Sequence, residues 1–503
     1  MPIDANVLTL GPWYGGVNYS KPAIELQPDE LFSMSNMTIL NNGELRKSKG
    51  FSKLNGSALN SGATVTGIGE NRFSSSSSET FAFCGNNFYS DIGGTPTSRK
   101  GSVTISTGND KTWVTANCNG TMLAVNGNGN DPAVTWAGAT SNLTTSDVDS
   151  RFTSAGGVVW WDNRAWAWDC SSGEDRVYYS SNTDITSWGA NDYFQIGERI
   201  YAVIPFQSFL ALIAEDSIHG LFPTGNASLP YSRERRVEKG SISRRSIKVS
   251  EAGWMYFARE EGLYRWDGGV QPEKISDKLE GERYWDLLNR ARLSEAFVEV
   301  VDHLNQIWFF LPNGSSQTSM NNIMIWDERI EAWSGPLNGF TRNSSSYFDN
   351  GIYAGGFDGF IYKHDNTEAF SGSSVSCEAR LAAPPPIAGA TDVRWLYARH
   401  HYSTEDANYE IGVTQSGPSI PSNLNLFNVG DPSDALETEF IVGESFIRGT
   451  DWGSFIDTRL WGYDPLTQLM YFNLSANQPF TIRQVELMWQ GIGNNFKAEK
   501  GIV

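Results

Sequence analysis

The chain has 503 residues, with 57 Asp and Glu against 38 Lys and Arg, which gives a formal net charge of −19 at pH 7. This balance argues against a general nucleic-acid-binding protein, which would carry a basic surface, and the length exceeds that of one small domain. Fifty glycines, 40% apolar residues and 13% aromatic residues favour an all-β chain with many turns and a sizeable core.

Targeting and cysteine signals are sparse. No window approaches the roughly 18 to 20 consecutive apolar residues that a membrane span needs. The first residues, Met1 to Asn6, lack the basic and apolar regions of a secretion signal, so we expect synthesis in a cytoplasm. Four widely separated cysteines form no CxxC pair, which favours buried free thiols over zinc or a disulfide framework.

Residues 1–61 are predicted to form an N-terminal arm. This segment contains Gly11 to Asn18, a short hairpin over Asn36 to Leu45 with an Asn-Asn-Gly turn, and the basic patch Arg46 to Phe51. Two interpretations remain open: the arm lies across the following domain, or it docks on a neighbouring subunit.

A β-meander recurs through residues 62–370, and its most distinct copy ends in the hairpin Gly253 to Gly269, where Gly262 provides a tight turn. Seven copies follow one another at a spacing of roughly 40 to 50 residues, which is typical of four-stranded propeller blades. Their first strands are Val65 to Gly69, Trp113 to Asn117, Val158 to Trp161, Tyr201 to Pro205, Ser246 to Val249, Ala296 to Val301 and Ser345 to Phe348.

One meander cannot bury both of its faces, so the copies are expected to stack radially into a β-propeller. Large residues near each third strand would fill the wedges between blades: Tyr89, Trp136, Tyr178, Tyr264, Trp326 and Tyr362. We count seven blades, with six as the alternative because the first two copies are weak. An irregular β-sandwich with coincidental spacing is the competing fold. Leu279 to Leu293 is predicted as the one helix.

Residues 371–503 are predicted to be a separate, sandwich-like β domain. A Ser/Gly stretch and Pro384-Pro385-Pro386 precede it as a linker. Its short strands and turn-rich gaps indicate a small sandwich. The expected strands are Cys377 to Leu381, Trp395 to His400, Tyr409 to Val413, Thr438 to Val442, Leu469 to Leu474 and Ile482 to Trp489.

A search for catalytic or metal-binding motifs favours a protein that is not an enzyme and needs no cofactor or metal. The sequence has no HExxH, Walker loop, GxSxG or helix-capping GxGxxG motif. Acidic residues at hairpin turns raise the question of a glycosidase, but Asp is common in turns for local reasons. Those candidates are Asp162, Glu215, Asp216, Glu260 and Asp267.

One basic cluster stands out in the acidic propeller region. It combines Arg233, Arg235 and Arg236 with Arg244 and Arg245. An interface with an acidic surface of another subunit, contact with DNA phosphates, and a solvated loop paired with Glu234 and Glu238 all remain open.

The succession Ala211 to Leu221, Gly240 to Ile247 and Trp254 to Gly268 resembles the propeller tail proteins of tailed phages. It is similar in particular to the tail nozzle, or packaged-DNA stabilisation protein, of short-tailed phages. The Gly11 to Asn18 and Arg46 to Phe51 segments also resemble the start of such proteins. The likeness covers about residues 10–370 and names no catalytic residue.

This resemblance implies a structural virion protein of the phage tail that forms a hexameric ring below the adaptor, extends the DNA channel and retains the genome until ejection. The implied partners are further copies of the chain, the head-to-tail connector, and a fibre, spike or needle, with DNA passing without sequence-specific binding. The assembly-interface candidates are Trp13, Tyr14, Arg46, Lys47, Lys49, Arg233, Arg235, Arg236, Arg244 and Arg245. The alternative function is a receptor- or glycan-binding, or glycan-degrading, tail propeller.

Overall fold

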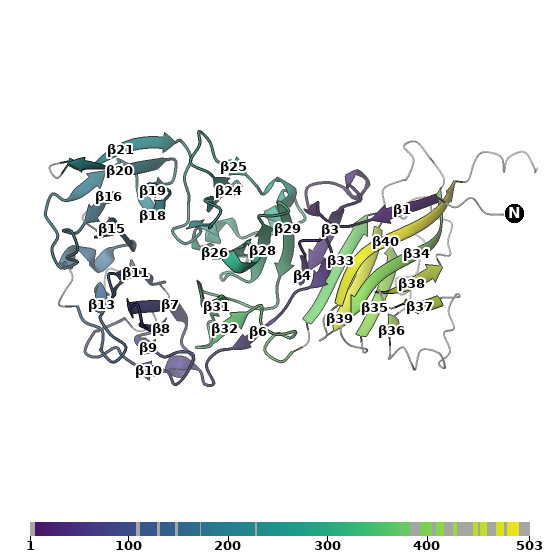
Figure 1. Ribbon diagram of the computed structural model, residues 1–503, viewed down its shortest axis with the longest axis horizontal. Helices are drawn as coiled ribbons and strands as arrows, with labels where there is room; N and C mark the ends of the chain where they lie inside the picture. The colour runs from purple at the N-terminus through teal and green to yellow at the C-terminus, as the bar shows by residue number, and fades with distance from the viewer. Residues whose placement is uncertain are drawn as a thin grey trace, which may run out of the picture.

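The computed structural model describes residues 6–382 except 107–110, 128–130, 146–148, 172, 227–228 and 374. Beyond residue 382 it describes 393–404, 409–416, 426–429, 446–450, 453–459, 469–476 and 480–491. The described chain is nearly all β, and its sheets fall into two groups: seven small sheets arranged in a ring and two larger sheets beside them (Figure 1).

The seven small sheets are the blades of a β-propeller. Six have four antiparallel strands and blade 2 has three. Blades 1 to 3 consist of β7 (Val65–Ser74), β8 (Ser77–Cys84), β9 (Asn87–Ser90) and β10 (Thr97–Ser98); β11 (Val114–Cys118), β12 (Thr121–Val125) and β13 (Val134–Trp136); and β14 (Gly157–Trp161), β15 (Arg164–Cys170), β16 (Gly173–Tyr179) and β17 (Tyr193–Gln195).

Blades 4 to 7 continue in chain order. They consist of β18 (Ile200–Phe206), β19 (Phe209–Ala214), β20 (Ile218–Asn226) and β21 (Leu229–Val237); β22 (Lys248–Val249), β23 (Met255–Arg259), β24 (Gly262–Trp266) and β25 (Glu273–Lys274); β26 (Phe297–Val301), β27 (Gln306–Leu311), β28 (Asn322–Asp327) and β29 (Ala332–Leu337); and β30 (Ser344–Phe348), β31 (Gly351–Gly355), β32 (Ile361–His364) and β6 (Phe51–Lys53). The seven repeats expected from the sequence are therefore seven blades.

The ring closes through a strand from the N-terminal arm. β6 pairs antiparallel with β32 and completes blade 7. On the inner side, β30 packs against β7 of blade 1. Ser344 Oγ and Asn343 Nδ2 both donate to the Val65 carbonyl, each at 3.1 Å. The two ends of the propeller are thus joined by hydrogen bonds as well as by apolar packing.

Apolar clusters occupy the wedges between blades, as radial stacking requires. One cluster combines Phe83 of blade 1 with Trp113 and Trp136 of blade 2, and another joins Trp166 of blade 3 to Leu210 of blade 4. Of the aromatic residues expected in the wedges, Trp136, Tyr178, Tyr264, Trp326 and Tyr362 are buried. Tyr89 packs, partly buried, against the cluster between blades 7 and 1. Cys84, Cys118, Cys170 and Cys377 are buried free thiols, and burial raises the pKa of each to about 12.

The two larger sheets combine strands from both ends of the chain. The first has the order β37 (Phe446–Thr450), β38 (Gly453–Arg459), β34 (Val393–Thr404), β40 (Phe480–Gly491), β5 (Leu45–Lys47) and β4 (Met37–Ile39), with β1 (Asn6–Leu10) also on β40. The second has the order β2 (Gly16–Val17), β3 (Glu30–Ser35), β33 (Val375–Ala382), β39 (Leu469–Ala476), β35 (Tyr409–Ser416) and β36 (Leu426–Val429). The segment expected at Thr438 to Val442 lies outside the described residues.

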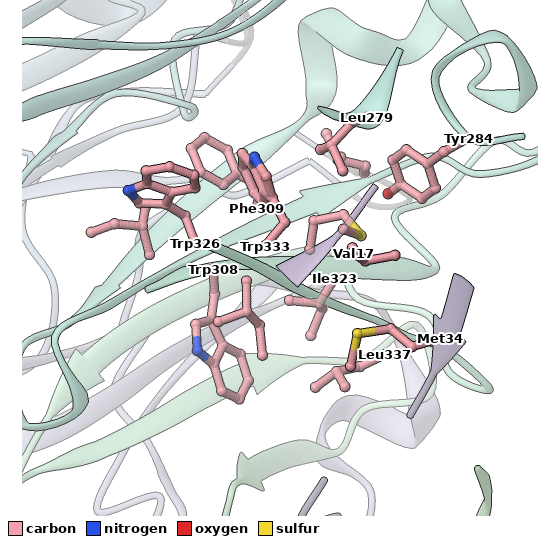
Figure 2. Close-up of a cluster of buried hydrophobic side chains, with 14 of the residues drawn as sticks. Val17, Met34, Leu279, Tyr284, Trp308, Phe309, Ile323, Trp326, Trp333 and Leu337 are labelled. Atoms are coloured by element: carbon pink, nitrogen blue, oxygen red, sulfur yellow. The ribbon is translucent and has the colours of Figure 1, made fainter. Parts of the chain in front are cut away.

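The N-terminal arm is therefore woven into the rest of the chain. β1 to β5 belong to the two larger sheets, while β6 belongs to the propeller. Figure 2 shows the resulting shared core: Val17 and Met34 of the arm lie beside Ile323 and Leu337 of blade 6, with Tyr284 nearby. One continuous apolar cluster thus joins the propeller to the second domain.

The predicted helix over Leu279 to Leu293 is wrong. The described part of the chain holds 3-10 turns instead: η1 (Ala23–Glu25), η2 (Leu59–Gly62), η3 (Ser150–Ser154), η4 (Asp277–Leu279), η5 (Trp285–Leu287), η6 (Arg290–Glu295) and η7 (Asp302–Leu304). Gly281 sits in the left-handed region with φ 95° and separates η4 from η5, which ends any continuous helix. Arg283 lies between these turns and donates to the carbonyls of Asn18 and Tyr19, so contacts with the arm shape the segment.

Candidate functional site

A cavity of about 860 Å³ lies where loops from blades 2 to 7 converge at one end of the propeller axis. Among the residues that the structure describes, six basic side chains and two acidic ones line it. The basic residues are Lys111, Arg199, Arg244, Arg245, Arg292 and Arg342, and the acidic ones are Asp169 and Glu295. This composition is the reverse of the whole chain, whose net charge is −19. We call this space the axial cavity.

The segment Gly240 to Ser246 carries two of these arginines into the axis, directly before the short inner strand β22. A Cβ at Gly240 would lie 1.9 Å from the Ala214 carbonyl oxygen, so only glycine allows this close approach. Buried hydroxyls then fix the segment: Ser241 Oγ donates to the Ala258 carbonyl at 3.0 Å and Ser243 Oγ to the Ala296 carbonyl at 2.6 Å. The loop is therefore tied to both blade 5 and blade 6.

Arg244 reaches across the axis from blade 5 to blades 2 and 3. Its Nη1 donates to the Gly156 carbonyl at 3.0 Å, and its Nη2 donates to the Thr112 carbonyl at 3.2 Å and to the Asn126 carbonyl at 3.3 Å. A Cβ at Gly127, where φ is 70°, would lie 2.9 Å from Nη1, so the glycine leaves space for the guanidinium. Burial lowers the pKa of Arg244.

Arg245 points toward the opposite blades. Its Nη2 donates to the Glu295 carbonyl of the loop before blade 6, and its Nη1 to the Asn343 carbonyl before blade 7, both at 2.5 Å. The guanidinium also lies 5.0 Å from the centre of the Phe297 ring. Burial and repulsion from Arg244 lower the pKa of Arg245 to about 9, which keeps the side chain charged at neutral pH. We call Arg244 and Arg245 the axial arginines.

Arg199 and Arg292, two further arginines of the axial cavity, are more exposed than the axial arginines. Arg199 is 50% exposed and contacts Asp169 through Nε at 3.1 Å and Nη2 at 3.0 Å. Arg292 is 43% exposed and pairs through Nη1 with the carboxylate of Glu295. Both acidic side chains of the cavity are thus engaged by exposed arginines. Neither axial arginine has an Asp or Glu oxygen within 4.0 Å among the residues that the structure describes.

Arg342 is more deeply buried than the axial arginines. It is 3% exposed and lies at the boundary between the axial cavity and a second cavity of about 750 Å³. Its guanidinium lies 3.9 Å from the Tyr362 ring centre and 4.4 Å from that of Phe51. Its Nε donates to His364 Nε2 at 3.0 Å. Burial, and then repulsion from Arg342, hold the pKa of His364 well below its usual value. Burial lowers the pKa of Arg342 itself to about 9.

The structure separates the basic cluster expected from the sequence. Arg233, Arg235 and Arg236 lie on β21, the outer strand of blade 4, and we call them the blade 4 arginines. Two of them have local acidic partners: Arg236 pairs with Glu234 at 3.3 Å and Arg235 with Glu238 at 3.8 Å. The axial arginines are partly buried in the axial cavity, so the five residues do not form one surface.

The arm residues are also divided between core and surface. Trp13 and Lys47 are fully buried within this chain. Lys47 Nζ donates to the Glu368 carbonyl at 2.7 Å, and burial lowers the pKa of Lys47. Arg46 lies 3.7 Å from the Glu368 carboxylate. Tyr14 is 44% exposed and Lys49 is half-buried, so these two and Arg46 are the arm candidates that reach the surface.

Three of the acidic residues considered for glycoside hydrolysis have partners within the fold. Asp162 accepts a hydrogen bond from Tyr231 at 2.7 Å, and Asp267 from the Gly269 amide at 2.8 Å. Asp216 faces Arg259 at 3.4 Å. Among described residues, no group of three or more His, Cys, Asp or Glu is placed to hold a metal. None of the helices in that part of the chain has the length and apolar character for crossing a bilayer.

Sequence reasoning identified Arg244 and Arg245 but missed Lys111, Arg199, Arg292 and Arg342 as their neighbours. These residues come from loops of different blades and are brought together only by ring closure. The single signal in the sequence is their common position, in or next to the loops that precede inner strands. What the arrangement provides chemically is a cationic surface with hydrogen-bond donors.

Comparisons with known proteins report on fold alone. No protein-family model matches the chain, and no curated protein does. Among solved structures, the chain is similar to the WD40 beta propeller domain of Doa1, with 9% identity, TM-score 0.40, and coverage of 62% of this chain and 96% of that one. BamB from Moraxella catarrhalis matches with 13% identity, TM-score 0.35 and coverage of 66% and 96%.

A third match has a different coverage. The extracellular domain of the putative one component system BT4673 from B. thetaiotaomicron shows 10% identity, TM-score 0.44 and coverage of 91% of this chain and 62% of that one. At these values the likeness carries no functional argument. The description of the chain as a β-propeller with an attached two-sheet domain rests on its strand pairing.

Proposed function

We propose that this protein is a structural component of a phage tail, the nozzle, which assembles into a ring of identical subunits around the DNA path. The observation that carries the proposal is the resemblance of residues 211–268. In the fold this stretch runs from β19 of blade 4, through the axial loop, to the β23–β24 hairpin of blade 5. The resembling residues are therefore one contiguous region of the propeller.

Two features of the fold suit a load-bearing subunit. The arm contributes strands to the propeller and to both larger sheets, so the two parts of the chain share backbone hydrogen bonds and a common apolar cluster. The blade 4 arginines lie on an outer strand, where they offer positive charge to the otherwise acidic surface of a neighbouring copy.

The DNA conduit in this proposal is the axis of the ring of subunits. The propeller's own axis does not serve, because Arg244 crosses it to reach blades 2 and 3. An acidic wall along the larger channel would repel DNA and let it slide, and salt would weaken that repulsion.

The test is assembly. We expect the purified full chain, alone or with the adaptor, to form a ring-sized oligomer in light scattering and to be present in tail particles by labelled imaging. A stable monomer that cleaves polysaccharide and is absent from particles would contradict the proposal. It would favour the glycan-degrading alternative.

A charge-reversal series locates the interface. Replacing Arg233, Arg235 and Arg236 together by Glu should impair ring formation, while Arg290→Glu serves as a matched control because Arg290 is 57% exposed and pairs with Asp286 away from β21. Normal infectious particles from the triple variant would exclude β21 as the contact surface.

A further inference from the structure

We propose that the axial cavity binds a small, multiply charged oxyanion, a molecule with two or more phosphate or carboxylate groups, between the exposed pair Arg199 and Arg292 and the axial arginines. This inference concerns a ligand site inside one subunit. It does not depend on whether the protein forms a phage nozzle.

The positive charge of the axial cavity is only partly compensated by acidic side chains. Asp169 is engaged by Arg199 and Glu295 by Arg292, so the two carboxylates of the cavity are already paired at its exposed side. The axial arginines contact carbonyl groups of neighbouring loops, and no described carboxylate lies within 4.0 Å of either. Charges withdrawn from water are normally paired, and among the described residues this lining carries more positive than negative charge.

The two axial arginines also repel each other. Burial lowers the pKa of both axial arginines, and Arg244 further lowers that of Arg245, to about 9. Both remain charged at neutral pH, on neighbouring residues in a site where water screens them poorly. An anion in the cavity would relieve this repulsion and raise the pKa of each guanidinium back toward its usual value.

Arg292 and Arg199 also have N–H groups that could donate hydrogen bonds to a ligand. Arg292 uses Nη1 for Glu295, and its Nε and Nη2 contact no other described residue. Arg199 uses Nε and Nη2 for Asp169, which leaves Nη1. The planar guanidinium fork matches the oxygens of phosphate and carboxylate groups. The cavity volume of about 860 Å³ also falls within the range of small-ligand sites.

A purely structural role for the arginines is the alternative to be excluded. The axial arginines clearly join distant blades, so replacing them would disturb the fold and the cavity together. Arg292 and Arg199 separate the two roles because they are about half exposed and also line the cavity. Loss of their charge should affect ligand binding far more than folding.

The experiment is calorimetric titration of the full-length protein with pyrophosphate and, separately, with citrate, at constant ionic strength. We expect saturable binding of at least one anion and a rise in Tm. Arg292→Gln and Arg199→Gln should each weaken binding by about tenfold or more, since a charge-assisted hydrogen bond is lost. Arg290→Gln, a charge removal outside the cavity, should leave the affinity unchanged.

The two anions distinguish which chemical group carries the negative charge of the ligand. Preference for pyrophosphate would indicate a phosphate-bearing ligand and preference for citrate a polycarboxylate. Absence of saturable binding by both anions would overturn the proposal. So would equal affinity of the wild type and a folded Arg292→Gln variant, because binding would then occur away from this cavity.

Discussion

The blade 4 arginines and the axial arginines lie close together in the sequence and have opposite environments. Arg235 is 47% exposed on an outer strand and faces the carboxylates of Glu198 and Glu238 at 3.8 Å. Arg245 is enclosed at the centre of the ring and binds backbone carbonyls of two other blades. The chain passes from one environment to the other between β21 and β22, through Gly240.

A run of basic residues in a sequence therefore does not specify a role by itself, because the role depends on whether the side chains are buried. An exposed pair gains little from Coulomb attraction because water and salt screen it. A buried guanidinium with carbonyl partners connects blades, because removing it leaves several polar groups unsatisfied in a medium of low dielectric constant. We therefore expect substitutions in the two groups to differ strongly in their effect on stability.

The largest effect is expected at the ring closure, where the buried side chain of Arg342 is held by aromatic rings. Phe51 on β6 lies 4.4 Å below the Arg342 guanidinium and stacks on Phe370 with ring centres 4.7 Å apart. Phe51→Ala should lower the free energy of unfolding by about 3 to 5 kcal/mol, the usual loss for a buried phenylalanine. Urea unfolding measures it, with the exposed Phe357→Ala as control. A loss equal to that control would mean that blade 7 closes without this contact.

The next effect is expected at the axis. Arg245→Ala leaves the carbonyls of Glu295 and Asn343 without their donors, and each buried unsatisfied group costs about 1 to 3 kcal/mol. We expect a loss of about 2 to 4 kcal/mol in urea unfolding, partly offset by relief of the repulsion on Arg244. A variant as stable as the wild type would show that the axial loop does not hold blades 6 and 7.

A smaller, pH-dependent effect is expected from His364, which contacts Arg342. Its pKa is held well below 6.5 in the folded protein, so it stays neutral there while the unfolded chain takes up a proton below pH 6.5. The unfolded state then binds more protons, and the free energy of unfolding falls as the pH falls, by at most about 1.4 kcal/mol per pH unit.

The measurement compares urea unfolding of the wild type and His364→Gln between pH 7 and pH 5. Burial raises the pKa of the neighbouring Asp365, which gives the opposite slope, and the comparison cancels this contribution because both proteins contain it. Burial also lowers the pKa of His219, and that contribution cancels likewise. Identical slopes in the two proteins would show that His364 takes no part.

Much of the propeller could be predicted from sequence because blade strands are short, apolar and separated by turn residues. Met255–Arg259 and Gly262–Trp266, for example, form the hairpin expected around Gly262. The helix prediction failed at Gly281, whose left-handed conformation outweighed the local pattern. Pairing of the arm with the last strand of the chain, such as Leu8 with Leu487, is a long-range contact that no local signal encodes.

The candidate site was less predictable for the same reason. Arg244 and Arg245 attracted attention as neighbours in sequence, but their functional surroundings include Arg199 and Arg292, which arrive from other blades. Local patterns report turns and apolar faces, whereas the meeting of loops at an axis depends on the number of blades and on closure by β6. The burial of Trp13 and Lys47 could not be predicted from the sequence either. A tryptophan or a lysine can lie at an interface or, with its apolar part, against the core of its own chain.

The smallest effect on stability is expected for the exposed blade 4 arginines. Arg235→Ala should change the free energy of unfolding by no more than about 0.5 kcal/mol, because its two ion pairs are long and solvated. Urea unfolding at low and at high salt measures both the size and the origin of the change. Any loss seen at low salt should shrink at 1 M salt, where the screening length is about 3 Å. A loss as large as that of Arg245→Ala would mean that β21 is stabilised by charge after all, and exposure would no longer separate the two groups of arginines.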